Sequence, residues 1–266
     1  MAAVANCFTA QDCNIVESSQ YLDHDSGRFF MRVRYTPPVN FQKETFASGF
    51  LPVATAYGVD WENHNTAYKP RVMIMVSKIG HCLNDLLYRH STGQLPMELV
   101  GVVSNHKTWQ TRVEHEGIAF HYLPVSSETK AEQELAILRI IEEQTIDLVV
   151  LARYMQVLSA DLCQKLNGRS INIHHSFLPS FKGARPYHQA FEHGVKLVGA
   201  TAHYVTSDLD EGPIIEQGVA RIDHAMTPDQ IVAKGRNIEC QVLASAVAYH
   251  LEHRIVLNGV RTIIFK

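Results

Sequence analysis

The sequence lacks the cysteine patterns that mark a disulfide framework or a thiolate zinc site. Only five cysteines occur in 266 residues, and no two of them are spaced as C-x-x-C. A chain of this length can bury a sizeable core without covalent cross-links, so the odd number and wide spacing indicate reduced thiols. We therefore expect a protein of the cytoplasm, where thiols stay reduced.

The chain also lacks a cluster of positive charge and a long apolar run. Its 24 Lys and Arg against 27 Asp and Glu give a net charge of -3, and no run of five basic residues occurs. This composition provides no electrostatic footprint for nucleic acid or an anionic membrane. No uncharged apolar stretch approaches the roughly 20 residues needed to cross a bilayer, and the N-terminus does not resemble a secretory leader. A small molecule is the expected partner, with neither nucleic acid nor membrane involved.

A glycine-rich phosphate loop is missing as well. Residues 77–81 read SKIGH between a predicted strand and a predicted helix, where such loops usually lie. The segment has one glycine and neither G-x-G-x-x-G nor GK[ST], and bulky Ile79 would keep the backbone away from a phosphate. The pattern therefore disfavours a nucleotide or phosphate site at this turn.

Residues 1–65 have the pattern of a small α+β unit. A helix over residues 1–9, strands over 14–21 and 28–35, a helix that ends at Gly58 and a last strand at 59–61 are predicted. The apolar face of the second helix is formed by Phe41, Phe46, Phe50 and Val53. This order is that of a ferredoxin-like fold without its first strand. An unfilled strand position invites pairing between chains, so we expect a homo-oligomer.

After a linker at 66–70, residues 71–266 have the pattern of a second domain. Near-continuous apolar runs at 71–76, 99–103 and 147–152 are typical of strands covered on both faces. They alternate with helical patterns, which predicts a mostly parallel α/β sheet with right-handed crossovers. The predicted buried helix faces are Cys82, Leu83, Leu86 and Leu87, and Ala131, Leu135, Leu138 and Ile141, the second after a capping box of Thr129 and Glu132.

The later part of this domain continues the alternation. Short helices are predicted at 159–167, capped by Ser159, and at 189–193, and strands at 171–173, 198–205, 213–217 and 259–265. A long helix is predicted from Thr227, a good N-cap followed by a proline, to about residue 253.

Polar side chains with catalytic potential follow the strand at 171–173. Asn172 and His174 are two residues apart and share a strand face, and the acidic loop with Asp208 and Asp210 could reach the same sheet edge. An amide and an imidazole can hold the oxyanion formed by attack on a carbonyl, while a carboxylate orients the imidazole. The alternatives are that Asn172 and the histidines cap the strand, and that Asp210 is an ordinary turn carboxylate in DLDEG. The loop after this strand is punctuated by Pro179, Gly183 and Pro186.

Motifs that the sequence lacks indicate what kind of nucleophile acts and whether a metal is bound. No G-x-S-x-G elbow occurs, so the nucleophile would be water or an amine rather than a protein hydroxyl. His174 and His175 point to opposite sides of a strand, and no H-E-x-x-H occurs, so we expect no metal site. The other histidines of this region are His188, His193 and His203.

The pair Asn172-Ile173-His174 and Leu209-Asp210-Glu211-Gly212-Pro213 resembles the motif of the folate-dependent formyltransferase family, and the likeness extends over about residues 70–266. Within the family, two segments are most similar to those of members that hydrolyse 10-formyltetrahydrofolate. They are NIHHSFLPSFKGARPYHQA and GATAHYVTSDLDEGPIIEQ. Residues 1–65 resemble the ACT domain in front of such members, beginning inside its first helix. The resemblance implies a Rossmann-like sheet, no required cofactor, and release of formate for one-carbon and purine metabolism.

The same resemblance assigns site residues. It implies that Asn172, His174 and Asp210 are catalytic and that His175 and Ser176 support them. It implies a folate pocket formed by Arg153, Met155, Gln156, Val157, Leu158, Thr206 and Asp208. Relatives that formylate glycinamide ribonucleotide have a glycine-rich loop where this chain has SKIGHC, so water is the expected acceptor. Transfer to an amine, metal-dependent hydrolysis and a non-catalytic ligand sensor are the alternatives.

Overall fold

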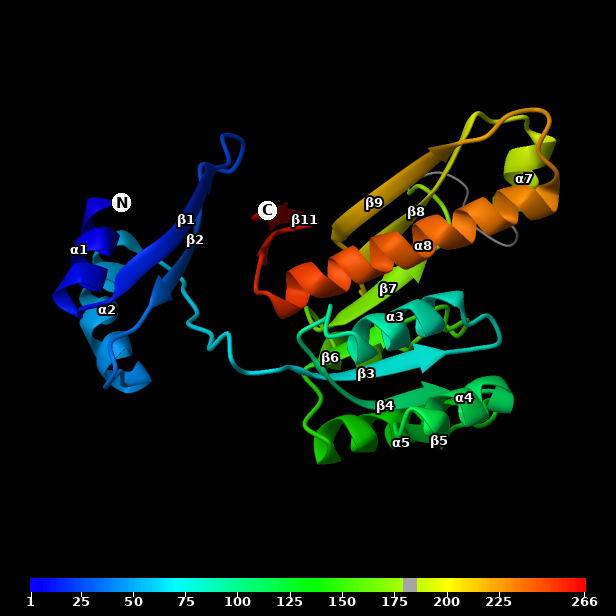
Figure 1. Ribbon diagram of the computed structural model, residues 1–266, viewed down its shortest axis with the longest axis horizontal. Coiled ribbons are helices and arrows are strands. Elements are labelled where there is room, and N and C mark those ends of the chain that lie inside the picture. Colours follow the sequence, from blue (N-terminus) through cyan, green and yellow to red (C-terminus); the bar gives the residue numbers. More distant parts are fainter. Residues whose placement is uncertain (179–185) are drawn as a thin grey trace. The chain divides into compact units, whose positions relative to one another are not determined.

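The computed structural model describes residues 1–178 and 186–266 (Figure 1). The predicted loop residues Pro179 and Gly183 lie outside the described residues. The chain divides into one unit of residues 1–65 with 265–266, and a second of residues 66–264. None of the described helices is long and apolar enough to cross a membrane.

The first unit packs two helices on one face of a two-stranded antiparallel hairpin (Figure 1). Its elements are α1 (Ala2–Ala10), β1 (Asn14–Leu22), β2 (Phe29–Thr36) and α2 (Lys43–Tyr57). Phe8 and Phe46 meet in an aromatic core, with ring centroids 5.2 Å apart. Gly58 ends α2 with a left-handed φ of 61°, as predicted.

The predicted strand at 59–61 is wrong, because these residues have no regular structure. Trp61 instead packs edge-on against Phe50, with ring centroids 4.8 Å apart. Packing the indole against the aromatic core removes apolar surface from water, and this contact fixes the segment without strand pairing.

The second unit is built on a seven-stranded sheet of order β5-β4-β3-β6-β7-β8-β9, in which the pairs from β5 to β7 are parallel and those of β8 and β9 antiparallel. Its strands are β3 (Arg71–Val76), β4 (Glu98–Ser104), β5 (Ala119–Tyr122), β6 (Leu148–Leu151), β7 (Ser170–His174), β8 (Leu197–Tyr204) and β9 (Ile214–Arg221), followed by a hairpin of β10 (Ile255–Asn258) and β11 (Arg261–Ile264). Its helices are α3 (His81–Ser91), α4 (Gln110–His115), α5 (Lys130–Glu143), α6 (Ala160–Lys165), α7 (Pro186–Glu192) and α8 (Pro228–Leu251), with a 3-10 turn at Lys107–Trp109.

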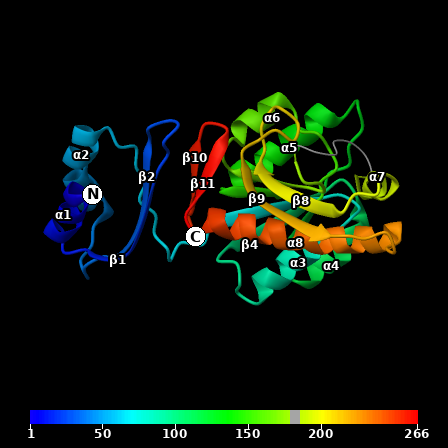
Figure 2. The ribbon, with the colours of Figure 1, turned by 90° about the horizontal axis from the view of Figure 1, so that it is seen from above.

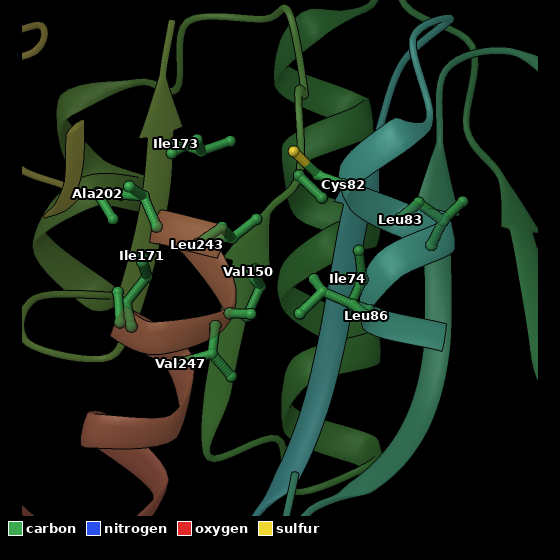
Figure 3. Close-up of a cluster of buried hydrophobic side chains, with 14 of the residues drawn as sticks. Ile74, Cys82, Leu83, Leu86, Val150, Ile171, Ile173, Ala202, Leu243 and Val247 are labelled. Carbon is green, nitrogen blue, oxygen red and sulfur yellow. The ribbon is translucent and has the colours of Figure 1, made fainter. Parts of the chain in front are cut away.

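Helices cover both faces of this sheet (Figure 2). On one face α3 and α8 pack on apolar residues of the central strands (Figure 3), and on the other α5 and α6 do so. Ile171 and Ile173 of β7 point into the core under α3 and α8. The alternation of a strand then turns Asn172 toward the opposite face. Strand order reverses around β3, and ligands of open α/β sheets bind at the carboxyl ends of the strands beside such a switch point.

The predicted buried face of α5 is confirmed at Ile141 and in part at Leu138, which is half-buried against the core, but it is wrong at Ala131 and Leu135. Leu135 is 62% exposed, whereas Gln133 and Glu134 are buried. Gln133 Nε2 donates to the Leu123 carbonyl (2.7 Å), and Glu134 Oε1 accepts from the Ser159 amide (2.8 Å). Burial of these polar groups is possible because the helix uses them to hold the loops on either side. The full buried set of α5 is Gln133, Glu134, Ile137 and Ile141.

The predicted capping box at Thr129 is also wrong, since this side chain makes no cap hydrogen bond to α5. Its oxygen accepts a hydrogen bond from the Ser126 amide instead (2.9 Å). A capping box forms at α8, where Thr227 and Gln230 bond reciprocally across the first turn. The cap of α6 by Ser159 is confirmed, with Oγ accepting from Leu162 N.

Candidate active site

The pairing of β7 with β8 brings a histidine beside Asn172. The antiparallel register places Asn172 opposite His203, and directly paired residues share one face of a sheet. Asn172 Nδ2 lies 3.2 Å from His203 Nε2. From the sequence, His203 was a candidate for metal binding only. The segment GATAHYV does not show which residue of a neighbouring strand lies opposite His203.

The hydrogen bonds of His203 fix its tautomer and orient the amide. His203 Nδ1 lies 2.8 Å from the Tyr204 carbonyl, which can only accept, so Nδ1 carries the proton. In the neutral ring Nε2 is then an acceptor, and the Asn172 amide donates to it. The second amide hydrogen of Asn172 has no acceptor among residues 1–178 and 186–266, so a ligand can accept it.

Asp210 reaches these side chains from the loop between β8 and β9. Its Oδ2 lies 3.1 Å from His174 Nδ1, and its Oδ1 lies 3.6 Å from His203 Nε2. The loop turns back tightly there: Asp210 has a left-handed φ of 57°, and a Cβ on Gly212 would lie 1.7 Å from the Tyr204 carbonyl oxygen. Only glycine permits this approach, so Gly212 lets the loop place Asp210 at the strand end.

The electrostatics keep Asp210 ionised. Burial, the largest influence, acts to raise its pKa, but His174 and the neighbouring His203 ring together hold the pKa of Asp210 well below its usual range. With Asp210 at Nδ1, the other nitrogen of His174, Nε2, is buried and has no hydrogen-bond partner among the described residues. This nitrogen and the Asn172 amide are therefore available to an oxygen of a ligand.

The two predicted supporting residues lie differently from each other. The His175 ring lies edge-on to His174 (5.1 Å between centroids) and to Tyr187 (6.4 Å). Burial, and then the charges of Arg153 and His174, lower the pKa of His175 to about 4, so the ring is neutral at pH 7. Ser176 is buried, and its carbonyl accepts from the Thr201 hydroxyl (3.0 Å), which ties the segment after β7 to β8.

The predicted folate residues fall into three positions. Arg153, just after β6, is buried, and its Nε lies 3.5 Å from Glu239 Oε2 on α8. Met155 and Val157 expose their side chains, whereas Gln156 and Leu158 are half-buried. Thr206 Oγ1 donates to the Asp208 carbonyl (3.1 Å), which closes a turn in the loop between β8 and β9. The structure thus brings the catalytic candidates together, while Arg153 contacts a different carboxylate.

That carboxylate, Glu239, was missed by the sequence argument. It is 1% exposed, with Oε2 2.8 Å from His81 Nε2, and its Oε1 accepts from the Tyr187 hydroxyl (2.8 Å). The Tyr187 ring lies so close to α8 that a Cβ on Gly235 would be 2.2 Å from it. Burial acts to raise the pKa of Glu239, but His81 and Arg153 lower it overall, so the carboxylate is ionised. A glutamate within an otherwise apolar helix face was the available signal.

Two buried neutral histidines predict a loss of stability in mild acid. Burial lowers the pKa of both His175 and His250 to about 4, whereas the unfolded rings titrate near 6.5. Between these values the unfolded chain binds more protons, so the free energy of unfolding falls as the pH drops. We expect a loss of about 2 kcal/mol for each ring between pH 7 and 5, measured by urea unfolding.

The variant His250→Gln tests the contribution of one ring, because it removes the titrating group beside the Tyr204 hydroxyl (2.8 Å). Its stability should fall less between pH 7 and 5 than that of the natural chain. The exposed residue His115 provides the control, since His115→Gln should keep the full pH dependence. An unchanged slope in His250→Gln would contradict this assignment.

The turn at 77–81 is occupied by protein. The Trp109 indole donates to the Lys78 carbonyl (3.2 Å), and its ring lies against Gly80. Ser77 is buried and bonds to Asn105 Oδ1 (2.8 Å) and to the Met155 amide (3.0 Å). Side chains of neighbouring segments therefore contact the turn at the position where a phosphate loop would bind its ligand.

Comparisons with known proteins agree with this architecture. A family model described as Formyl transferase matches residues 70–247. The formyltetrahydrofolate deformylase of Corynebacterium sp. is 50% identical, covering 99% of this chain and 93% of the relative, and that of Bacillus subtilis is 43% identical, covering 100% and 89%. The crystal structure of the formyltetrahydrofolate deformylase from Burkholderia mallei has a TM-score of 0.94 at 47% identity, covering 100% of this chain and 94% of that one. The glycinamide ribonucleotide transformylase 1 of Symbiobacterium toebii is less similar, with a TM-score of 0.71 at 27% identity, covering 79% and 99%.

Proposed function

The chain belongs to the formyl transferase family and, within it, to the formyltetrahydrofolate deformylases, and we propose from this that it hydrolyses 10-formyltetrahydrofolate to formate and tetrahydrofolate. The identity to deformylases extends over both units of the chain, whereas the transformylase covers 79% of it at 27% identity. The observation that supports the chemistry is the buried Nε2 of His174, which has no partner in the part of the chain that the structure describes, beside the amide of Asn172.

In the proposed reaction water attacks the formyl carbon, and the carbonyl oxygen becomes an oxyanion. The Asn172 amide and the His174 Nε2–H donate to this oxygen, and ionised Asp210 at Nδ1 favours the imidazolium form that has both protons. The tetrahedral intermediate then collapses as the bond from carbon to N10 breaks. The proton lost by water on attack ends on N10, and the product leaves as formate once its remaining hydroxyl proton has passed to solvent.

The proposed folate pocket lies at the carboxyl end of β6, next to these groups. Met155 and Val157 expose apolar side chains that would pack on the pterin ring system, and the half-buried Gln156 and Leu158 would line its edge. The Thr206–Asp208 turn would close the pocket through its backbone. Arg153 would shape the pocket without giving its side chain to the ligand, because Glu239 faces its guanidinium, and its carbonyl, which accepts from Ser77 N (3.2 Å), ties this strand end to β3.

Water is the proposed acceptor, with an amine such as glycinamide ribonucleotide as the alternative. A ribonucleotide acceptor needs a site for its phosphate, and backbone amides at a strand-to-helix turn are the usual one. Here the Trp109 ring lies against Gly80 and the turn bonds to its neighbours. This arrangement favours hydrolysis.

A formate-release assay tests the proposal directly. The enzyme incubated with 10-formyltetrahydrofolate alone should release formate and tetrahydrofolate in equal amounts, because water needs no binding site of its own. Addition of glycinamide ribonucleotide should leave the rate of formate release unchanged and yield no formylated product. Turnover that begins only after the amine is added would identify a transferase instead.

We also propose that residues 1–65 form an ACT-like unit and that the protein is a cytoplasmic homo-oligomer paired through it. The support is the hairpin of β1 and β2, which exposes apolar side chains beyond what a free surface needs. These are Val16, Tyr21, Leu22 and Phe29. Sedimentation equilibrium of the full chain would give the mass of a monomer if this expectation is wrong.

A further inference from the structure

Three potential metal ligands meet where α3 packs against α8. A ring nitrogen of His81 and the sulfur atoms of Cys82 and Cys240 all lie within 4.8 Å of one another. Cys82 is buried in the first turn of α3 (Figure 3), and Cys240 is half-buried on α8. None of the three is among the catalytic or folate-binding candidates, so the cluster is a separate feature of the fold.

His81 is held in the tautomer that a metal ligand requires. Its Nε2 lies 2.8 Å from Oε2 of Glu239, and a carboxylate oxygen that faces a ring nitrogen accepts its hydrogen, so Nε2 is the donor in this pair. Nδ1 is buried without a hydrogen-bond partner among the described residues, so this nitrogen is the one that can turn its lone pair to a metal ion. A histidine that donates one ring N–H to a carboxylate and offers the other nitrogen to the metal is the usual arrangement in zinc sites.

The carboxylate behind His81 is itself fixed. The Tyr187 hydroxyl donates to Glu239 Oε1 (2.8 Å), and Arg153 Nε lies 3.5 Å from Oε2. Contacts with Tyr187 and Arg153 thus fix the orientation of the Glu239 carboxylate. The carboxylate in turn orients the His81 imidazole. Such support behind a ligand is worth about 10–100-fold in metal affinity.

We propose that His81 Nδ1, Cys82 Sγ and Cys240 Sγ bind one Zn²⁺ ion, with water in a fourth position. Two thiolates and an imidazole are ligands that zinc prefers, and together with the ion they form a neutral unit suited to a buried place. The two thiol protons leave to solvent on binding. Tetrahedral zinc keeps ligand atoms about 3.5–3.8 Å apart, so separations of up to 4.8 Å would have to close by about 1.3 Å at most. The half-buried Cys240 side gives the ion its access.

Cobalt provides a direct test, because thiolate ligands give Co²⁺ an intense charge-transfer absorption that other ligands do not. The full chain, reduced and freed of metal with a chelator, should develop this absorption to saturation at one Co²⁺ per chain. Zn²⁺ should abolish it by displacement and should raise the melting temperature, since the ion binds only the folded chain.

Variants separate a built site from non-specific thiol binding. Cys240→Ser should weaken Zn²⁺ binding by at least about a hundredfold and remove most of the charge-transfer absorption, because one of three ligands is lost. The matched control is Cys163→Ser on α6, a buried cysteine outside the cluster, which should bind as the natural chain does. Circular dichroism checks that each variant is folded, and His81→Gln repeats the test if Cys240→Ser is not. Absence of the absorption in the natural chain, or its full retention in folded Cys240→Ser, would overturn the proposal.

Discussion

Replacement of Asp210 by asparagine should lower kcat for formate release by about 10³–10⁴, with little change in the free energy of unfolding. Asparagine has nearly the same shape, but it removes the negative charge that lies 3.1 Å from His174 Nδ1 and favours the imidazolium. In another hydrolase, the same exchange of a carboxylate that orients a catalytic imidazole costs about 10⁴ in kcat. KM should change less than kcat, since the charge acts mainly on the transition state.

The measurement is steady-state formate release by Asp210→Asn and by Glu211→Gln. Glu211 is an exposed carboxylate in the same loop, so its variant controls for the loss of one negative charge near the site. Activity of Asp210→Asn within tenfold of the natural enzyme would exclude Asp210 from the catalytic role proposed for it. A parallel urea titration verifies that the loop change has not unfolded the chain.

Removal of the imidazole in His174→Ala should reduce kcat by about 10²–10³, the usual loss for one donor to an oxyanion. The effect follows from the position of His174 Nε2, which is buried and has no partner among residues 1–178 and 186–266. Because the donor bonds strongly only when charge develops on the substrate oxygen, the loss should fall on kcat rather than on KM. The natural comparison is His115→Ala, at an exposed position on α4, which should retain full activity.

A combination of the two changes sharpens the test. If Asp210 acts through His174, the double variant Asp210→Asn/His174→Ala should be hardly slower than the slower single variant, since residues that act as a unit are not additive. Losses that multiply would show instead that the two side chains work independently.

The placement of side chains at the end of β7 was predictable because it depends on a period of two. Asn172 and His174 alternate with Ile171 and Ile173, and the apolar pair faces the core under α3 and α8. The motif with Asp210 then pointed to the partner loop, which the structure places at hydrogen-bond distance from His174. Local patterns and one recognisable motif were sufficient for these residues.

Contacts between distant segments were not predictable in the same way. His203 faces Asn172 only through the register of β7 and β8, which no local pattern specifies. Glu239 meets His81 from 158 positions away. The absence of C-x-x-C excluded only those zinc sites whose ligands are close in sequence, so it could not address Cys82 with Cys240. On α5 the buried polar residues depend on loops whose course the helix sequence does not contain.

The close approach of Tyr187 to Gly235 has an evolutionary consequence. A glycine within a helix costs about 1 kcal/mol relative to alanine, so drift should favour its replacement unless something prevents it. Here a Cβ at position 235 would lie 2.2 Å from the Tyr187 ring. The ring would have to move, and its hydroxyl would then lose the hydrogen bond to Glu239. A larger residue at position 235 can therefore be accommodated only if the Tyr187 ring moves away or position 187 becomes smaller, so the effects of substitutions at the two positions should depend on each other.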